Sequence, residues 1–307
     1  MEQKSSWDEF ANSIYEQFEK TGGLSLDDKV KFDPEACFPC GGVCCFAPEI
    51  LLTPYDIYRL AKAGVFKKLK VNLSDFLKKF CEVYVGPHSK VPIVKLGTEE
   101  HRVCPFLAPV LCKDKDGVLK QKIGGSGKPM FLCGIHNVKP FKCRLFPLGM
   151  IASSDGRSGI VFLNRDSCKG CDTSKEISVR QVLGVDVLNV DKAALAMDVT
   201  GEATKLAHAI SADDRFLKFF NSLLFSILYE ASYQFGEKGI EFEKLVEMQR
   251  DLMKKVPDTI KSSDFQQVLA KHGVTVTLKE EKKDEQKIVT GCRPAEKVHL
   301  GDSKNLQ

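Results

Sequence analysis

CFPCGGVCC, residues 37–45, is the stretch that decides the fold of this chain, because it places four thiols within nine residues. Two cysteines separated by two residues lie on one tight turn, from which both thiolates can reach the same metal ion. Gly41 suits the crowded turn that follows Cys40. Four small core residues at this density would be unusual. The stretch therefore predicts metal binding, and we expect its four cysteines to be ligands: Cys37, Cys40, Cys44 and Cys45.

Five further cysteines downstream are also predicted metal ligands. Cys104 stands alone, Cys133 and Cys143 flank a short segment, and Cys168 and Cys171 form a second CxxC pair. Single thiols from distant positions can hold a loop-rich domain around a shared metal. The predicted ligands are thus nine of the twelve cysteines: Cys37, Cys40, Cys44, Cys45, Cys104, Cys133, Cys143, Cys168 and Cys171.

The remaining cysteines have other expected roles. Cys81 shares the apolar face of an expected helix, which indicates a core residue. Cys112 borders a polar insertion and is a lesser ligand candidate, whereas Cys292 lies in a charged tail. Among the histidines, His136 is more typical of a surface or core residue than of a ligand, and His88 and His101 have less support still: none of these joins the predicted site.

Charge and hydropathy exclude several classes of protein. The 307 residues include 45 basic and 41 acidic side chains, and no basic stripe with interleaved aromatics predicts nucleic-acid binding. The first residues, MEQKSSWD, lack the order of a signal peptide, and the longest apolar run, 223–229, is too short to span a membrane. We therefore expect a cytoplasmic protein, where reduced cysteines serve as metal ligands rather than disulfides.

Hydrophobic periodicity predicts an α+β chain in four parts. An amphipathic helix and lead-in occupy 1–34, and a small cysteine-rich α+β domain stapled by metal occupies 35–172. A helical C-terminal region follows at 173–273, and a charged tail at 274–307. Expected helices cover 7–18, 54–61, 74–81, 173–183, 191–210, 213–235, 242–256 and 265–271; expected strands cover 83–85, 91–96, 130–132, 148–151 and 160–163. The glycines at 124–127 are expected at a hairpin tip rather than in a phosphate-binding loop.

The motifs in residues 35–172 resemble the YkgJ-type family, also described as the CxxCxxCC, or zinc- or iron-chelating, domain. Three departures stand out: the gap between Cys40 and Cys44 is one residue longer, His136 replaces the usual Tyr, and Lys139 replaces the usual Arg. The long insertion before Cys133 and the helical C-terminal half are outside the family core. The motifs that carry the resemblance are Cys37–Cys45, Leu52-Thr53-Pro54 with Asp56-Ile57 and Arg59-Leu60, Cys104-Pro105-Phe106-Leu107, and Cys133-x-Ile135-x3-Lys139-Pro140-x2-Cys143-Arg144-x-Phe146-Pro147.

The resemblance implies metal binding and leaves the role open. Family members are described as iron–sulfur or zinc proteins, and one relative joins such a domain to a flagellin lysine N-methylase. Adjacent Cys44 and Cys45 point to opposite sides of an extended segment, which favours two neighbouring centres. Eight or nine thiols fill two zinc sites or two clusters, and the scattered single cysteines favour iron–sulfur, as one or two 4Fe–4S clusters, over zinc.

Three classes of function stay open on the sequence. The first is a redox or electron-transfer protein with an unidentified redox partner. The second is a structural zinc domain whose helical half binds another protein. The third is a modifying enzyme, methyltransferase-like, although no Ser/His/Asp order, nucleotide fingerprint or pair of catalytic carboxylates is recognisable and no catalytic residue is predicted.

Overall fold

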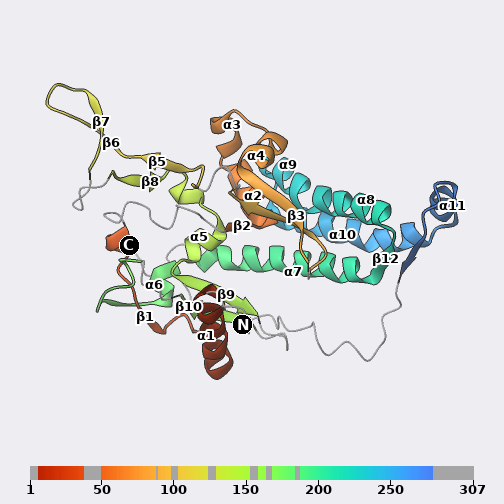
Figure 1. Cartoon of the computed structure of the whole chain (residues 1–307), viewed down its shortest axis with the longest axis horizontal. Helices are drawn as coiled ribbons and strands as arrows, with labels where there is room; N and C mark the ends of the chain where they lie inside the picture. The colour runs from red at the N-terminus through yellow and green to blue at the C-terminus, as the bar shows by residue number, and fades with distance from the viewer. Residues whose placement is uncertain are drawn as a thin grey trace, which may run out of the picture.

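The computed structural model describes residues 6–37, 50–87, 89–97, 103–123, 129–152, 158–163, 168–183 and 187–278. Within them, helices combine with small antiparallel sheets, so the class is mixed α+β (Figure 1). The long C-terminal helices lie side by side; strands β5 to β8 (within residues 107–133) lie toward the left-hand end of Figure 1, whereas β3 (Cys81–Val85) and β12 (Ile210–Ala212) lie beside the helices. Several predictions fall outside the described residues: those on Cys40, Cys44, Cys45, His88, His101, Cys292 and the glycines at 124–127.

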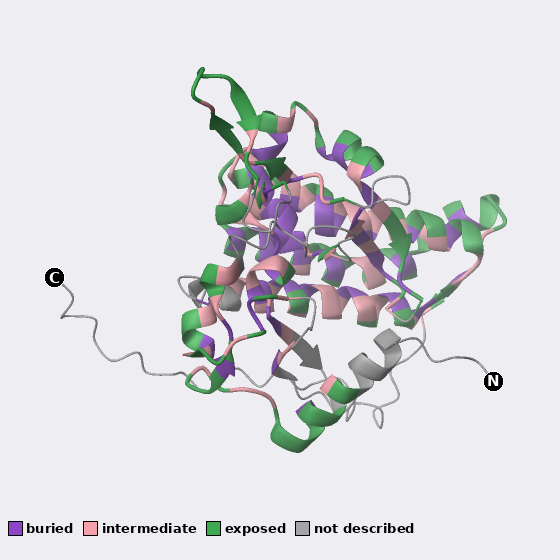
Figure 2. Cartoon of the chain, turned by 60° about the vertical axis from the view of Figure 1, so that its left-hand side comes forward, coloured by how far each residue is buried: buried purple, intermediate pink, exposed green. Residues whose placement is uncertain are grey.

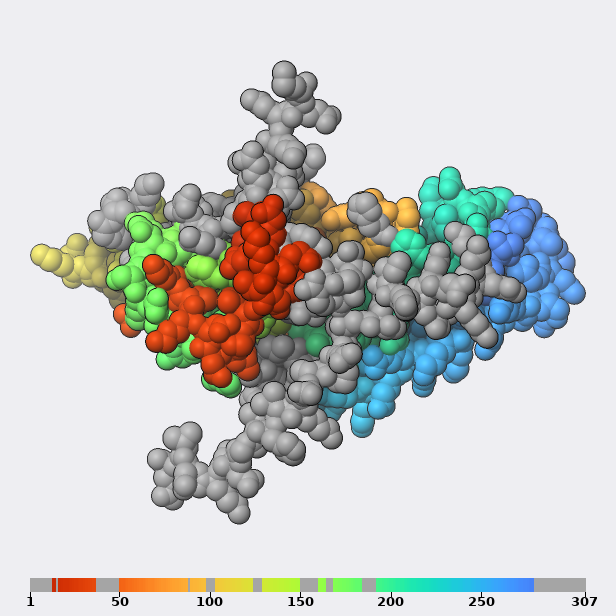
Figure 3. All heavy atoms as spheres, turned by 90° about the horizontal axis from the view of Figure 1, so that it is seen from below, coloured from red at the N-terminus to blue at the C-terminus, as the bar shows by residue number. Residues whose placement is uncertain are grey.

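The chain begins with α1 (Ser6–Thr21), which confirms the helix expected there. Phe18 is completely buried, and the N–H of Gly22 donates to the Phe18 carbonyl over 2.8 Å where the helix ends. Strand β1 (Lys29–Lys31) and the 3-10 turn η1 (Pro34–Cys37) follow. Figure 3 shows these red segments resting against the green part of the chain, consistent with the pairing of β1 with β11 (Glu176–Ser178).

A three-stranded antiparallel sheet with the order β2-β4-β3 supports the first group of helices. Its strands are β2 (Ile50–Leu52), β3 (Cys81–Val85) and β4 (Pro92–Leu96), which confirms the two strands expected near 83–96. The helices between them are α2 (Pro54–Lys62), α3 (Val65–Leu69) and α4 (Leu73–Phe80). The expected cap of α4, Ser74, is wrong: Asn72 Oδ1 accepts the Asp75 N–H over 2.9 Å, so the helix starts earlier. Cys81 begins β3 and is 7% exposed, which confirms it as a core residue.

Three hairpin-like pairs and two short helical turns form the cysteine-bearing part of the chain. The strands expected near 130–132, 148–151 and 160–163 are all present. The pairs are β5 (Leu107–Pro109) with β8 (Phe131–Cys133), β6 (Leu111–Lys113) with β7 (Leu119–Gln121), and β9 (Leu148–Ala152) with β10 (Ser158–Phe162); the turns are η3 (His136–Val138) and α5 (Phe141–Leu145).

The helix expected at 173–183 is wrong over its first half. Glu176–Ser178 instead form β11, antiparallel to β1, and only α6 (Val179–Leu183) is helical. The hydroxyl of Thr173 accepts the N–H of Lys175 over 3.1 Å, a local turn rather than the expected capping box with Glu176. Pairing with a distant strand therefore outweighs the local helix signal.

The C-terminal half is a set of long helices. The helix expected from residue 213 is present, and Asp213 caps it, since its Oδ1 accepts the Phe216 N–H over 2.9 Å. The expected helix 213–235 continues through one turn of π-helix. The elements are α7 (Val187–Ala209), β12 (Ile210–Ala212), α8 (Asp214–Phe225), the π-helical η5 (Ser226–Glu230), α9 (Ala231–Glu237), α10 (Phe242–Lys261), α11 (Ser263–Lys271) and β13 (Val276–Leu278).

Helix α10 does not stop before Pro257, as the sequence predicted, but continues to Lys261. Its buried face includes Met253 and Ile260, two turns apart, which are 5% and 4% exposed. Burying Ile260 on the core offsets the hydrogen bond that a proline removes from a helix.

One hydrophobic core joins the helical half to residues 50–97 (Figure 2). Helix α2 packs on α9, where a side chain at Gly236 would collide with the Tyr58 carbonyl oxygen and the Ala61 methyl group. The rings of Tyr55 and Tyr58 pack on Phe242 with centroids 4.6 and 5.1 Å away. Helix α2 is therefore held rigidly by the helical half and can position what lies on its other side. No helix among the described residues has the length and apolar content needed to cross a bilayer.

Candidate metal centre

A buried carboxylate on α2 fixes the short helix that carries Cys143. Asp56 is 1% exposed, and its Oδ1 accepts the backbone N–H of Phe141 over 2.7 Å. Its Oδ2 accepts the N–H and the hydroxyl of Thr53 over 2.9 and 2.8 Å. Phe141 is the first residue of α5, so this N–H has no partner within its own helix. One carboxylate thus joins the first turns of α2 and α5.

Arg59, one turn further along α2, holds the chain just before α5. Its guanidinium donates to the carbonyl oxygens of Lys139 and Asn137 over 3.4 and 3.5 Å and lies 5.7 Å from the ring centroid of Tyr55. Burial raises the pKa of the Tyr55 hydroxyl, while the charges of Arg59 and Arg144 oppose the rise. The segment from η3 to α5 is therefore attached to α2 at both of its ends.

The structure brings three predicted ligands into one electrostatic neighbourhood. Burial raises the pKa of the Cys143 thiol to about 12; Cys104, Asp56 and Cys133 add to the rise, and Lys139 opposes it. These cysteines come from separate segments. Cys104 and Cys133 are nevertheless close enough to Cys143 to affect its pKa, which the cysteine spacing in the sequence did not establish.

Strand pairing brings the segments of Cys104 and Cys133 side by side. Cys133 ends β8 directly opposite Leu107 of β5. The carbonyl oxygen of Cys104 accepts the Leu107 N–H over 3.0 Å, which turns the chain into β5, and Gly134 N–H donates to the Phe106 carbonyl over 2.7 Å. A Cβ on Gly134 would lie 3.3 Å from the Phe106 carbonyl oxygen, so the absent side chain permits this close approach.

The second CxxC pair forms the tight turn that its spacing predicts. The N–H of Cys171 donates to the Cys168 carbonyl oxygen over 2.9 Å, and Cys171 is 8% exposed. The turn lies against the segment that leads to Cys37, because Asp33 N–H donates to the Gly170 carbonyl oxygen over 2.8 Å. Cys168 and Cys171 therefore lie beside the start of the first cysteine cluster.

The described residues do not form a complete metal site by themselves. In residues 6–37, 50–87, 89–97, 103–123, 129–152, 158–163, 168–183 and 187–278, no three His, Cys, Asp or Glu side chains are arranged to hold one ion. Predicted ligands Cys40, Cys44 and Cys45 are outside these ranges. The described donors nevertheless fit a soft metal: burial raises the pKa of the Cys143 thiol, which keeps its proton without a metal, and a bound metal would displace that proton.

Electrostatics also limit what Cys143 can do without a metal. A reactive cysteine needs a lowered pKa, and the raised pKa of Cys143 argues against a catalytic nucleophile. Burial, followed by the charges of Lys139 and Arg144, lowers the pKa of nearby His136, which therefore favours its neutral form. At neutral pH these shifts disfavour Cys143 as a nucleophile and His136 as a proton donor.

Sequence reasoning missed the supporting residues of this site. Asp56 was expected only at the start of a helix, whereas its carboxylate also anchors α5. Because a capping box uses only one carboxylate oxygen, the second oxygen was free to accept another donor, and this could have been predicted. Nothing in the sequence near Arg59 predicted that its guanidinium donates to the carbonyl oxygens of Lys139 and Asn137. The remaining described cysteines lie elsewhere: burial raises the pKa of Cys81 to about 12, and Cys112 is exposed in β6 with Sγ 3.6 Å from the Lys120 carbonyl oxygen.

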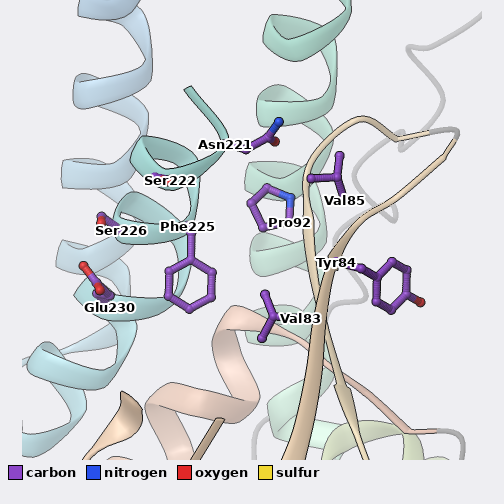
Figure 4. Close-up of a pocket in the computed structure, with 9 residues that line it drawn as sticks. All are labelled: Val83, Tyr84, Val85, Pro92, Asn221, Ser222, Phe225, Ser226 and Glu230. Carbon is purple, nitrogen blue, oxygen red and sulfur yellow. The ribbon is translucent and has the colours of Figure 1, made fainter. Parts of the chain in front are cut away.

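A groove of about 370 Å³ lies apart from the thiols, between the β3–β4 hairpin and the α8–η5 helix (Figure 4). Val83, Pro92 and Phe225 face one another across it, and Glu230 is its one carboxylate. The lining lacks cysteine and histidine, so the groove has no part in metal binding. Its residues are Val83, Tyr84, Val85, Pro92, Asn221, Ser222, Phe225, Ser226 and Glu230.

Comparison of the chain with family models, curated proteins and solved structures finds no match, so the family resemblance stays a prediction.

Proposed function

We propose that this chain is a metal-binding cysteine-cluster protein whose centre is an iron–sulfur cluster with a redox or electron-transfer role. One observation carries the proposal: Cys104, Cys133 and Cys143 come from separate segments, yet Cys104 and Cys133 both raise the pKa of buried Cys143. Like groups in a low-dielectric interior repel one another once ionised. A bound cation core offsets that repulsion, which supports a ligand role for these thiols.

The described ends of the first cysteine cluster support two centres. The chain is described up to Cys37, beside the turn of Cys168 and Cys171, and again from β2, which contacts α5. Cys168 and Cys171 thus lie beside the segment that leads to Cys37, and Cys143 lies on the helix that contacts β2. Under this proposal Cys168 and Cys171 belong to one centre, and Cys104, Cys133 and Cys143 to the other.

The residues around Cys143 have defined parts in this proposal. When bound, a cluster would accept and release electrons. Partial burial of Cys143 disfavours its thiolate, and the positive charge of Lys139 favours the thiolate. The hydrogen bonds that Asp56 and Arg59 make fix α5 and the loop before it. Under this proposal Cys143, which lies on α5, therefore keeps its position when the charge of the cluster changes.

Structural zinc is the second candidate, and the anchoring of α5 is the observation that favours it. Closed tetrahedra of thiolates would leave no open position for chemistry and would staple the loops to α2. Helix α2 already packs on the helical half, which would then supply the surface for a protein partner. A modifying enzyme has less support because Cys143 is unsuited to nucleophilic attack.

Anaerobic purification with metal analysis and an absorption spectrum tests the proposal. We expect a brown protein with a visible band that dithionite bleaches. A colourless protein holding stoichiometric zinc would contradict the iron–sulfur centre. Cys143→Ser and Cys133→Ser should each lose metal, while Cys112→Ser, an exposed thiol on β6, is the matched control that should retain it.

A further inference from the structure

The β6–β7 hairpin, residues 110–123, extends away from the rest of the described molecule (Figures 1 and 3). Its base is firmly attached. Val110 N–H donates to the Met130 carbonyl oxygen over 3.0 Å, Met130 N–H to that of Lys122 over 2.9 Å, and Lys122 N–H to that of Val110 over 2.7 Å. Met130 is only 4% exposed. The hairpin is therefore an ordered projection rooted in the core.

The turn of the hairpin is also built from specific contacts. Asp114 Oδ1 accepts the backbone N–H groups of Asp116 and Val118, each over 2.9 Å. Gly117 takes a φ of +75°, a conformation that favours glycine. Lys120 Nζ lies 2.7 Å from Asp114 Oδ2. The tip keeps one shape although it has little core of its own, so its side chains are presented in a fixed arrangement.

Most residues of the hairpin are exposed (Figure 2), and several of them are large and apolar. Leu111, Val118, Leu119 and Ile123 are between 53% and 61% exposed. In the strand register Leu111 lies opposite Gln121 and Lys113 opposite Leu119, which puts the two leucines on one face. Exposed apolar side chains that share a face with polar neighbours, here Lys113 and Gln121, suit an interaction site.

Positive charge lies near these apolar side chains: Lys113 shares the face of Leu111 and Leu119, whereas Lys120 lies on the other face, opposite Cys112. Residues 110–123 contain four lysines and two aspartates, so the hairpin carries +2, half of the net charge of +4 of the whole chain. The lysines are Lys113, Lys115, Lys120 and Lys122. Lysine stems can lie along an apolar surface while their ammonium groups reach anionic headgroups. Residues 110–123 contain no arginine or aromatic side chain to read or stack on bases, which disfavours nucleic acid.

We propose that the β6–β7 hairpin docks the protein on an anionic membrane surface. Leu111 and Leu119 enter the boundary between headgroups and acyl chains, and the lysines contact the lipid phosphates and carboxylates. This is attachment to one leaflet through a projecting hairpin, and it requires no membrane-spanning helix. It is independent of the metal and of the redox role.

Vesicle flotation of the full chain tests this docking. We expect binding to phosphatidylcholine vesicles that contain phosphatidylserine, and weaker binding as salt is raised, because salt screens exposed charges. The double variant Leu111→Ser/Leu119→Ser and the double variant Lys113→Glu/Lys115→Glu should each lower the partition coefficient by about tenfold or more. Matched controls on the helical half are Val268→Ser, at a valine 50% exposed, and Lys244→Glu, at an exposed lysine; both should bind like the parent.

Several results would overturn the docking proposal. They are an absence of binding to either vesicle, equal binding to pure phosphatidylcholine, and full binding by both double variants. Binding to duplex nucleic acid without vesicle binding would do the same, as would a dimer in solution that the leucine variant dissociates. Unchanged circular dichroism and melting temperature of the variants confirm that they fold, and metal content measured in parallel keeps this test separate from that of the metal centre.

Discussion

The carboxylate of Asp56 accepts the backbone N–H of Phe141 over 2.7 Å, across 85 residues of sequence. The same carboxylate completes the capping box of α2 with Thr53. A capping side chain usually bonds only to its own helix, but here the second oxygen of Asp56 accepts a hydrogen bond from the first residue of another helix, α5. Because α2 is packed against the helical half, this bond transmits the rigidity of the core to the segment that carries Cys143.

Replacing Asp56 should therefore cost more than the loss of an ordinary cap. Asp56→Ala leaves the buried N–H of Phe141 and the part-buried donors of Thr53 without this acceptor, so we expect the free energy of unfolding to fall by about 3 kcal/mol or more. Asp56→Asn keeps one acceptor oxygen and should lose less. Chemical denaturation followed by circular dichroism measures both. The control is Asp75→Ala in the first turn of α4, where the carboxylate is exposed; an equal loss there would contradict a special role for Asp56.

Removing the metal should destabilise the cysteine-bearing part of the chain. Thiol ligands from separate segments are cross-linked only while the metal is bound, so its binding free energy contributes to folding. We expect a chelated or oxidatively bleached sample to melt at a lower temperature and to expose residues 104–143 to limited proteolysis. Cys143→Ser should behave like the metal-depleted protein, and Cys112→Ser like the parent. Identical melting with and without metal would show that the site has no structural part.

Gln249 stabilises the π-helical turn between α8 and α9. Its buried side-chain amide donates to the carbonyl oxygens of Ile227 and Leu228 over 2.8 and 3.2 Å. Gln249→Leu would leave these buried acceptors without that donor, and we expect a loss of about 2 kcal/mol in the free energy of unfolding. Glu247→Ala, exposed on the same helix, is the control and should change stability by less than about 0.5 kcal/mol. A neutral Gln249→Leu would show that water satisfies these carbonyls.

The contribution of Asp213 to the stability of the start of α8 should decrease at acid pH. The Phe216 N–H donates to its carboxylate, and this bond, assisted by Arg215, holds the pKa of Asp213 below its ordinary value of 3.8. A lowered folded pKa means that the stabilisation is complete above the unfolded pKa and is lost as pH falls through the folded one.

Asp213→Asn isolates this effect, because asparagine also caps helices but does not titrate. Melting temperatures of parent and variant, measured from neutral pH to about pH 2.5, should converge or cross as the parent loses its charged cap. A constant difference over that range would mean that the carboxylate charge contributes nothing to α8.

The sequence by itself determined those elements whose signals lie within a few residues. Thr53, Pro54 and Asp56 predict the start of α2, and Asp213 that of α8, because a cap bonds a side chain to a backbone group three residues away. The hairpin of β9 and β10 was likewise predictable from two apolar runs around a turn. Cysteine spacing predicted the tight turn of Cys168 and Cys171.

Tertiary structure decided the rest, because the deciding contacts join residues far apart in sequence. The strand β11 replaces the expected helix since β1 supplies partners about 150 residues earlier, and α10 continues past Pro257 since Ile260 is buried on the core. The approach of the segments that carry Cys104, Cys133 and Cys143 depends on the pairing of β5 with β8 and on the hydrogen bond from the Phe141 N–H to Asp56. Residue type thus predicted which thiols are suited to a metal, and long-range packing determined which of the described segments lie near one another.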